Sequence, residues 1–392
     1  MDTQLFDKLV SIRRHLHQNP ELSFTEFKTA AFVETQLSQL DIPIERLALT
    51  GVIGTIAKGG GPTVVLRADM DALPILEESG VPFPSQTEGI MHACGHDIHT
   101  TMLLGAAHLL KAAEFKGTIK LVFQPAEEGP MRSPEKGKSG AQLIMESGRL
   151  DGADFVLGLH VHPLLPVGIL SYKNGEALAN VGNFSIRING KGGHPGLMKE
   201  VIDPIAIAAR LITAAQSGLI LPEASGPQPG PPTAVLAITY VSTETNPSFN
   251  VIPSHVLLQG SLRANRIADY NDIVSRLNIL LRSLEAEYGC TIELDFSAYY
   301  PSLLNDPRLH QWLSPVYEKI FGGANVTEGQ AYLVGEDFSF YSRAIPGQFY
   351  FLGAKTEQND RYFLHHPKVT FNEECIKYGA TFLAESALQL LR

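Results

Sequence analysis

The stretch Met91-His92-Ala93-Cys94-Gly95-His96-Asp97-Ile98-His99 gathers three histidines, a cysteine and an aspartate within nine residues. A thiolate and imidazoles are donors that suit Zn²⁺, and imidazole with carboxylate also accepts Mn²⁺, Co²⁺ or Ni²⁺. One glycine separates Cys94 from His96, and on an extended or turning backbone this spacing directs both side chains to the same side. For an isolated Cys-x-His pair we would favour a buried cysteine beside solvated histidines, so the flanking segments must decide.

Buried strands lie on either side of this stretch, and each ends in polar residues. The segments are 63–67 before Asp69 and Asp71, 118–124 before Glu127 and Glu128, and 154–160, which ends on His160 and precedes His162. Continuous apolar strands are typical of a sheet covered on both faces, and open α/β sheets bind ligands at the carboxyl ends of their strands. The convergence of Asp, Glu and His on one sheet edge therefore predicts a metal site.

Apolar periodicity predicts the rest of this first domain. Helices are expected at residues 5–19, 25–40, 99–114, 307–320 and 371–391, with further strands at 51–57 and 348–353. From about residue 178 the pattern changes, because residues 183–188 alternate with the period of a half-exposed antiparallel strand.

The segment from residue 178 has its own set of elements. Strands are predicted at 233–241, 256–263 and 291–296, and helices at 269–288 and from Pro204, which Asp203 caps. We therefore predict an α/β protein in which a mixed-sheet first domain, residues 1–177 and 298–392, contains an inserted α+β domain, residues 178–297. A Pro/Gly-rich connection, residues 222–232, lies within the insert.

Length and composition indicate a globular protein of more than one domain: 392 residues, 44% hydrophobic and 18% charged. The net charge of −10 leaves no excess of basic residues with which to bind nucleic acid or an anionic membrane. The amino terminus has no basic segment followed by an apolar one, and no run is long and apolar enough to span a bilayer. Cys94, Cys290 and Cys375 make no disulfide framework, so we expect a reducing cytoplasm.

Several motifs follow one another in a specific order. They are His92-Ala93-Cys94-Gly95-His96-Asp97-Ile98-His99, Phe123-Gln124-Pro125-Ala126-Glu127-Glu128-Gly129, Gly158-Leu159-His160-Val161, Gly190-Lys191-Gly192-Gly193-His194 and Leu364-His365. Together they resemble the aminoacylase/carboxypeptidase family of dinuclear metallohydrolases, in the branch of hippurate hydrolase, N-acetyldiaminopimelate deacetylase and plant auxin-conjugate hydrolases. The match covers nearly the whole chain, and motifs in order are more specific than any one alone. The resemblance implies a zinc-peptidase-like catalytic domain with an inserted lid that mediates homodimerisation.

The resemblance also implies roles for individual residues. Two metal ions, with zinc or manganese favoured, would be bound by Cys94, His96, Glu128, His160 and His365. Glu127 would be the general base, Asp69 and Asp71 would orient the ligands, His194 would reach a neighbouring subunit's active site, and Asn250 and Arg263 would bind the substrate's carboxylate. Without the resemblance, Asn250 and Arg263 would be interpreted as ordinary residues of the inserted sheet. We interpret His15, His17, His108, His255 and His310 as ordinary, Cys290 and Cys375 as structural, and His162 and His366 as bystanders.

The expected reaction is hydrolysis of the amide bond of an N-acyl amino acid. A metal lowers the pKa of bound water towards about 7 and polarises the carbonyl, and Glu127 would move the proton to the departing nitrogen. His194 would stabilise the oxyanion, and Arg263 would grip a carboxylate with two hydrogen bonds. The segment 130–139, absent from the usual family pattern, lies beside the base and bears on substrate choice.

Other functions stay open at this stage. A metallocarboxypeptidase or dipeptidase would use the same site. A hydrolase with Cys94 as nucleophile would keep its activity in the presence of a metal chelator. A catalytically silent binding protein would not need Glu127 together with every candidate ligand. A dinucleotide site at Gly190-Lys191-Gly192-Gly193 is weaker, because the spacing misses Gly-x-Gly-x-x-Gly.

Overall fold

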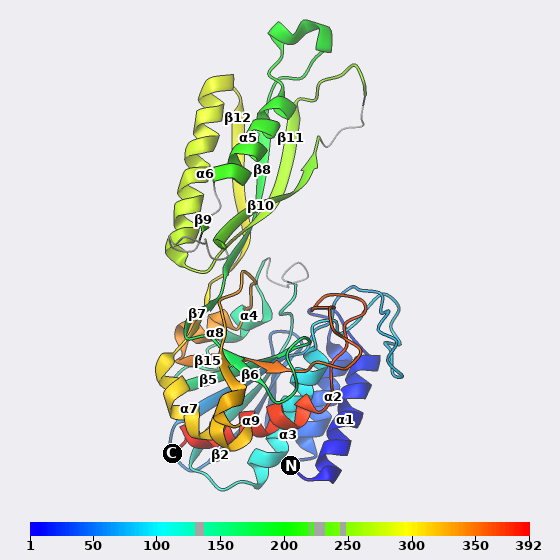
Figure 1. Ribbon diagram of the computed structural model, residues 1–392, viewed down its shortest axis with the longest axis vertical. Helices are drawn as coiled ribbons and strands as arrows, with labels where there is room; N and C mark the ends of the chain where they lie inside the picture. The colour runs from blue at the N-terminus through cyan, green and yellow to red at the C-terminus, as the bar shows by residue number, and fades with distance from the viewer. Residues whose placement is uncertain (130–136, 219–220, 223–231, 244–247) are drawn as a thin grey trace. The chain divides into compact units, whose positions relative to one another are not determined.

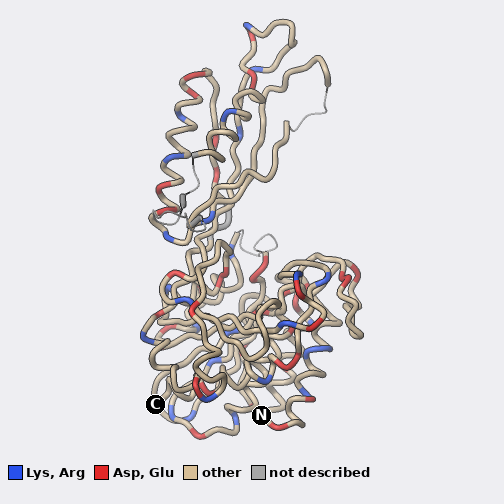
Figure 2. Tube along the Cα trace, viewed as in Figure 1, with Lys and Arg blue, Asp and Glu red and all other residues tan. Residues whose placement is uncertain are grey.

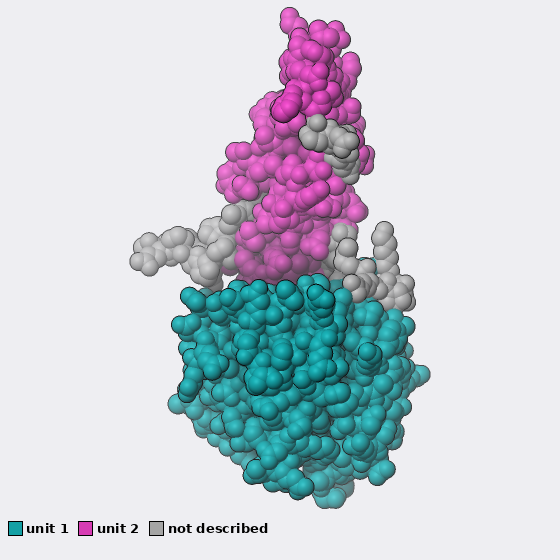
Figure 3. Space-filling model, turned by 90° about the vertical axis from the view of Figure 1, so that its right-hand side faces the viewer, with its two compact units in different colours: residues 1–175, 304–330, 337–392 teal, residues 176–303, 331–336 magenta. Residues whose placement is uncertain are grey.

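The computed structural model describes residues 1–129, 137–218, 221–222, 232–243 and 248–392, and they form two compact units (Figures 1 and 3). Unit 1 comprises Met1–Gly175, Leu304–Gln330 and Asp337–Arg392, and unit 2 comprises Glu176–Leu303 and Ala331–Glu336. Most of the 130–139 segment and of the Pro/Gly-rich connection lies outside the described residues. The domain boundaries expected at 178 and 297 stay a prediction.

Unit 1 is an α/β unit built around one mixed sheet. In chain order its elements are α1 (Thr3–Gln18), α2 (Phe27–Ser38), β1 (Ile44–Leu47), β2 (Gly51–Lys58), β3 (Thr63–Asp69), α3 (His96–Ala112), β4 (Gly117–Gln124), α4 (Gly140–Glu146), β5 (Phe155–His162), β6 (Leu170–Tyr172), α7 (Pro307–Ile320), η3 (Gly323–Asn325), β14 (Val326–Glu328), α8 (Ser339–Ala344), β15 (Gly347–Gly353) and α9 (Cys375–Leu390). The described strands pair in the order β1-β2-β4-β3-β5-β15-β6-β14, and the central run from β4 to β15 is parallel. The predicted mixed-sheet α/β class is confirmed.

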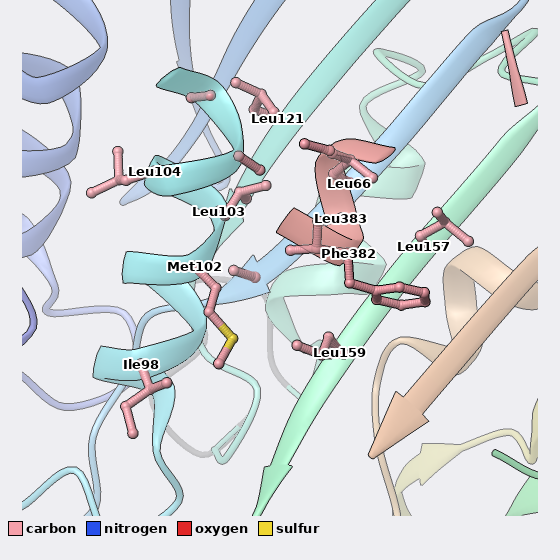
Figure 4. Close-up of a cluster of buried hydrophobic side chains, with 14 of the residues drawn as sticks. Leu66, Ile98, Met102, Leu103, Leu104, Leu121, Leu157, Leu159, Phe382 and Leu383 are labelled. Atoms are coloured by element: carbon pink, nitrogen blue, oxygen red, sulfur yellow. The ribbon is translucent and has the colours of Figure 1, made fainter. Parts of the chain in front are cut away.

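Both faces of the central strands are covered. On one face, Leu66 of β3 and Leu159 of β5 lie with Met102 and Leu103 of α3 and with Phe382 of α9 in one buried cluster (Figure 4). On the other face, Arg67 of β3 donates to Asp337, in the segment before α8, at 2.8 Å. Because no face is left for water, β3 is buried from its second residue to its end, as the continuous apolar pattern predicts.

Helix α3 begins earlier than the periodicity predicts. The expected start was near residue 99, but the helix starts at His96 with Gly95 as its N-cap. Gly95 has φ +88° and no side chain to cap the helix, so the usual Ser, Thr, Asp or Asn signal is missing. The consequence is that His96 lies in the first helical turn while Cys94 lies outside the helix.

Unit 2 is an α+β unit. In chain order its elements are β8 (Asn180–Asn189), η2 (Pro195–Glu200), α5 (Pro204–Gly218), β9 (Leu221–Pro222), β10 (Pro232–Ser242), β11 (His255–Ala264), α6 (Ile267–Tyr288) and β12 (Thr291–Tyr300), with β7 (Gly175–Leu178) and β13 (Leu303–Asn305) where the chain passes between the units. The sheet order is β12-β8-β11-β10-β9, and all its pairs are antiparallel.

Both long helices of unit 2 cover the same sheet, which explains the alternating sequence. Helices α5 and α6 each pack on β10 and β11 and contact one another. Phe184, Ile186 and Ile188 of β8 are buried, whereas Ser185 and Arg187 between them are only partly buried. The period of two therefore reflects one face covered by helices. The Asp203 carboxylate accepts the Ile205 N–H at 2.9 Å, as expected of the predicted cap.

Acidic and basic residues are interspersed along both units (Figure 2). Among the described residues, no helix has the length and apolar character that a membrane crossing requires.

Candidate metal centre and catalytic site

The candidate donors come from neighbouring strand ends. Parallel pairing puts Asp69 beside Gln124 and Arg67 beside Gly158, so β3, β4 and β5 deliver their following residues to one edge. Potential ligand atoms of unit 1, the five predicted ones among them, fall into overlapping groups whose members lie within 4.8 Å of one another. The groups made of unit 1 residues alone are Cys94, His96 and His160; Asp69, His96 and His99; Cys94, Glu128 and His365; and His96, Glu127 and Glu128. The structure thus brings all of the metal-ligand candidates of unit 1 together.

Gly95 is required for this arrangement. Its φ of +88° is a left-handed conformation that L side chains rarely adopt, and a Cβ there would lie 2.4 Å from Cγ2 of Val161. A backbone without Cβ lets the Cys94–His96 turn approach β5 directly behind His160. The Cys94 sulfur lies 3.4 Å from His160 Nε2.

Hydrogen bonds set the orientation of each imidazole. Nδ1 of His160 donates to the carbonyl of Val161 at 2.8 Å, and Nδ1 of His96 donates to Asp71 Oδ1 at 3.2 Å. In both residues the lone pair of Nε2 is therefore available to coordinate a cation. Nε2 of His96 is buried without a hydrogen-bond partner, which is the condition of a ligand atom directed at an ion.

His99 was not assigned a role from the sequence. The structure places it beside the candidate ligands, between Asp69 and Val161. Its Nε2 accepts the Val161 N–H at 2.9 Å, so its Nδ1 carries the proton and donates to Asp69 Oδ1 at 2.7 Å. His99 thereby joins the ends of β3 and β5. Its position three residues after His96, on the same face of α3, is the only sequence signal that points to it.

The glutamate pair lies on a turn that Asp71 holds. The N–H of Glu127 donates to Asp71 Oδ1 at 3.2 Å, and the N–H of Glu128 donates to Oδ2 at 2.9 Å. The Glu128 carboxylate lies 2.9 Å from Nε2 of His365. The backbone N–H of His365 donates to the carbonyl of Ala93 at 3.0 Å. Asp71 therefore aligns His96 and both glutamates at once, which suits the orienting role proposed for it.

Asp69 is balanced by a buried cation that the sequence did not reveal. Arg67 donates to Asp69 at 2.7 Å, to Asp337 at 2.8 Å and to Gln124 at 2.8 Å. Burial by itself would raise the pKa of Asp69, but the charges of His96 and Arg67 and the hydrogen bond from His99 outweigh it and hold this pKa well below its usual range. Asp69 is therefore an anion beside the donor cluster.

A second buried network supports the start of α3. His17, expected to be ordinary, is buried and pairs with Asp97 at 2.8 Å and Glu77 at 3.1 Å. Arg13 lies 3.0 Å from the same Asp97 carboxylate. These contacts tie α1 and the irregular segment before residue 91 to the residue next to His96.

The remaining predicted residues belong to unit 2. His194 is exposed, and its Nδ1 accepts the Gly196 N–H at 3.1 Å, which leaves the proton on Nε2. Its loop pairs with the loop of Asn250, because Gly193 and Ile252 form an antiparallel bridge. Arg263 is half-buried near the other end of β11 and donates to the carbonyl of Leu333 at 3.0 Å. Within unit 2, then, His194 and Asn250 lie together and Arg263 lies apart.

The donor set fits a pair of borderline-soft divalent cations. It combines one thiol, imidazoles with Nε2 presented and carboxylates, and two of its groups share Cys94. Burial and the charges of Glu128 and Glu127 raise the pKa of the Cys94 thiol well above its ordinary value. A cysteine nucleophile needs the opposite shift, so the surroundings of Cys94 do not favour the alternative cysteine-based hydrolase.

Comparison with known proteins agrees with this geometry. Residues 65–389 match the model of peptidase family M20/M25/M40. The chain is 39% identical to the IAA-amino acid hydrolase ILR1-like 5 of Arabidopsis thaliana, over 98% of this chain and 87% of that protein. It is 36% identical to the N-acetylcysteine deacetylase of Bacillus subtilis, over 100% of this chain and 98% of that one.

A solved structure extends the likeness to the whole fold. The YXEP protein of Bacillus subtilis, described as a dinuclear metal-binding peptidase of the M20 family, is 34% identical with a TM-score of 0.84, covering 100% of this chain and 99% of that chain. Fold and relatives together define a metal-dependent hydrolase of amide or peptide bonds. The chain belongs to peptidase family M20/M25/M40, which confirms the resemblance seen in the motifs.

Proposed function

We propose that the protein hydrolyses N-acyl amino acids at a two-metal centre formed by Cys94, His96, Glu128, His160 and His365, with Glu127 as general base. The observation that carries the proposal is the joining of these donors into overlapping groups around Cys94 and His96. A bound pair of divalent ions supplies an acidified water and polarises the substrate carbonyl. Zinc and manganese are the ions that this mixture of thiolate, imidazole and carboxylate favours.

Adjacent glutamates take different roles in this proposal. Glu128 approaches His365 and groups with Cys94, so we assign it to the metals. The Glu127 carboxylate lies within 4.8 Å of His96 and Glu128, and Asp71 holds the backbone of both glutamates. From there Glu127 accepts a proton at its carboxylate and returns it to the departing nitrogen, a task that is typically worth 10²–10⁴-fold in rate.

The substrate class follows from the relatives and from the charges of unit 2. One relative described above is named as an IAA-amino acid hydrolase and the other as an N-acetylcysteine deacetylase, and we infer for this chain an amino acid acylated at its nitrogen. Such a substrate has a free carboxylate next to the scissile amide. We assign its recognition to Arg263 of one chain and, since Asn250 lies apart from Arg263 and beside His194, to Asn250 supplied by a second chain; a guanidinium and a side-chain amide both donate to carboxylate oxygens.

We further propose that unit 2 is a lid through which two chains form a homodimer. The His194 and Asn250 loops follow the far end of β8 and precede the start of β11, about 30 Å along the strands from Asn180 and Ala264. Exposed apolar side chains accompany them, namely Leu197, Met198, Phe249 and Val251. Such a patch is typical of a surface that meets another chain. His194, with its proton on Nε2, would stabilise the oxyanion in the partner's site.

Unpaired thiols suit the reducing compartment expected from the sequence. Cys94, Cys290 and Cys375 are all free and buried.

The test compares Glu127→Gln with Glu128→Gln on a panel of N-acetyl amino acids. Glu127→Gln should fold, keep nearly normal metal content and lose roughly 10²-fold or more in kcat, because glutamine keeps the shape without the proton acceptor. Glu128→Gln should instead lower metal affinity, with partial rescue by excess metal. If Glu127→Gln loses metal while Glu128→Gln retains it, the two roles are reversed.

A further inference from the structure

The turn between α1 and α2, residues 20–26, packs against Asp71 and Ala72 beside the candidate site. Leu22 forms a parallel bridge with Ala72, and the Ala72 N–H donates to the carbonyl of Glu21 at 2.8 Å. Ser23 and Glu26 of this turn are buried, and Phe24 between them is buried as well. Two polar side chains are thus directed inward from a surface turn, and each must have a partner there.

Their partners are the backbone of the glutamate turn and its support. Glu26 Oε1 accepts the N–H of Ala126 at 2.9 Å. The Ser23 hydroxyl donates to Asp71 Oδ2 at 2.7 Å, and Asp71 in turn accepts the N–H groups of residues 127 and 128. The carboxylates of Glu26 and Asp71 therefore accept hydrogen bonds from three consecutive backbone N–H groups, those of residues 126, 127 and 128.

Ala126 explains why such support is needed. It is fully buried with φ +51°, a left-handed conformation that is unfavourable for a residue with a Cβ. A backbone in this conformation persists only where its surroundings hold it. Its N–H is held by Glu26, and its carbonyl accepts the Gly140 N–H at 3.2 Å. The direction in which the next residue, Glu127, leaves this turn depends on both contacts.

We propose that Glu26, assisted by Ser23, is a positioning residue for the hydrolysis: it holds the left-handed turn at Ala126 and so aims the Glu127 carboxylate. This inference rests on the proposed function, because it requires Glu127 to be the base. The role is one of geometry, since Glu26 reaches the turn through the backbone N–H of Ala126.

The environment of Glu26 indicates that acceptance of a hydrogen bond, rather than charge, is what matters. Burial and the neighbouring charge of Asp71 raise the pKa of Glu26 to about 8. A neutral carboxyl still offers a carbonyl oxygen to Ala126, and its second oxygen lies 2.6 Å from the Thr50 hydroxyl, which both donates and accepts. Glutamine offers the same carbonyl, so it should substitute well, whereas alanine should not.

The experiment uses the metal-loaded full chain and a matched control in the same turn. Glu21 accepts the N–H groups of Lys28 and Thr29 at the start of α2, so Glu21→Ala weakens the turn without removing a contact to residues 126–128. Glu26→Ala should lose roughly 10–100-fold in kcat with KM little changed, the scale expected when a reacting group is displaced by about 1 Å. Glu26→Gln should recover most of that loss, Ser23→Ala should lose less, and Glu21→Ala should lose thermal stability with kcat near wild type.

A second measurement does not depend on turnover. Amide hydrogen exchange of the metal-free protein should become faster at residues 126–128 in Glu26→Ala and should stay at the wild-type rate there in Glu21→Ala. Equal loss of kcat in Glu26→Ala and Glu21→Ala, or wild-type exchange at residues 126–128 in Glu26→Ala, would overturn the inference.

A double-mutant cycle separates this inference from the proposed function. If Glu26 acts through Glu127, adding Glu26→Ala to Glu127→Gln should cause little further loss of kcat. Additive losses would refute the positioning role alone. A fully active Glu127→Gln enzyme would refute the proposed function and, with it, the inference.

Discussion

Replacing Gly95 with alanine tests whether backbone geometry holds the donor cluster together. Alanine at φ +88° costs about 1–2 kcal/mol relative to glycine. The new Cβ would also lie 2.4 Å from Cγ2 of Val161 and 3.3 Å from Cζ of Phe371, and overpacking of this kind costs about 1–3 kcal/mol. The free energy of unfolding should therefore fall by about 2–5 kcal/mol in Gly95→Ala.

The matched control is Gly59→Ala. Gly59 has φ +75°, and nothing lies within 4 Å of the position of its Cβ. It should show only the backbone cost, about 1–2 kcal/mol. The difference between the two variants isolates the contact with Val161.

That contact also predicts a loss of metal affinity. Val161 follows His160 and donates its N–H to His99, so its displacement moves two residues of the cluster. We expect Gly95→Ala to bind zinc roughly 10–100-fold more weakly, the loss seen when the supports of ligands are disturbed. Urea unfolding of metal-free protein and competition with a chelator measure the two effects. The reasoning fails if Gly95→Ala matches Gly59→Ala in stability and wild type in zinc affinity.

Three further predictions follow from the site and its surroundings. Elemental analysis of metal-loaded, desalted protein should find two divalent ions per chain, as in the dinuclear relative, and a value near zero in fully active protein would contradict the metal centre. His194→Ala and Glu127→Gln, each inactive alone, should recover some activity when mixed under conditions where subunits exchange, and no recovery in proven heterodimers would remove His194 from the partner's site. Because the pKa of Glu26 rises from its ordinary 4.5 to about 8 on folding, the folded state keeps a proton that the unfolded state releases, and stability should fall as pH rises across this interval. Between pH 5 and 7 the free energy of unfolding of metal-free wild type should fall by roughly 2.5 kcal/mol more than that of metal-free Glu26→Gln, and parallel profiles would contradict this.

The fold class and the clustering of the candidate ligands could be predicted because both depend on short-range patterns. Continuous apolar segments before Asp69, Glu127 and His160 indicate buried strands, and parallel strands have their carboxyl ends at one edge. Ordered motifs then identified the family without any knowledge of contacts. These signals survive in the sequence because each strand must satisfy the same burial and pairing rules along its own length.

The contacts that support the donors depended on tertiary structure. Arg67 and Asp337 are 270 residues apart and Glu26 and Ala126 are 100 apart, and no periodicity relates such positions. The early start of α3 was missed because Gly95 carries no capping side chain, and the left-handed turn at Ala126 was missed because alanine gives no sign of positive φ. A buried carboxyl or guanidinium must find a partner, but which partner it finds is decided only when distant elements pack, because the cost of burial is met by whatever group the fold places beside it.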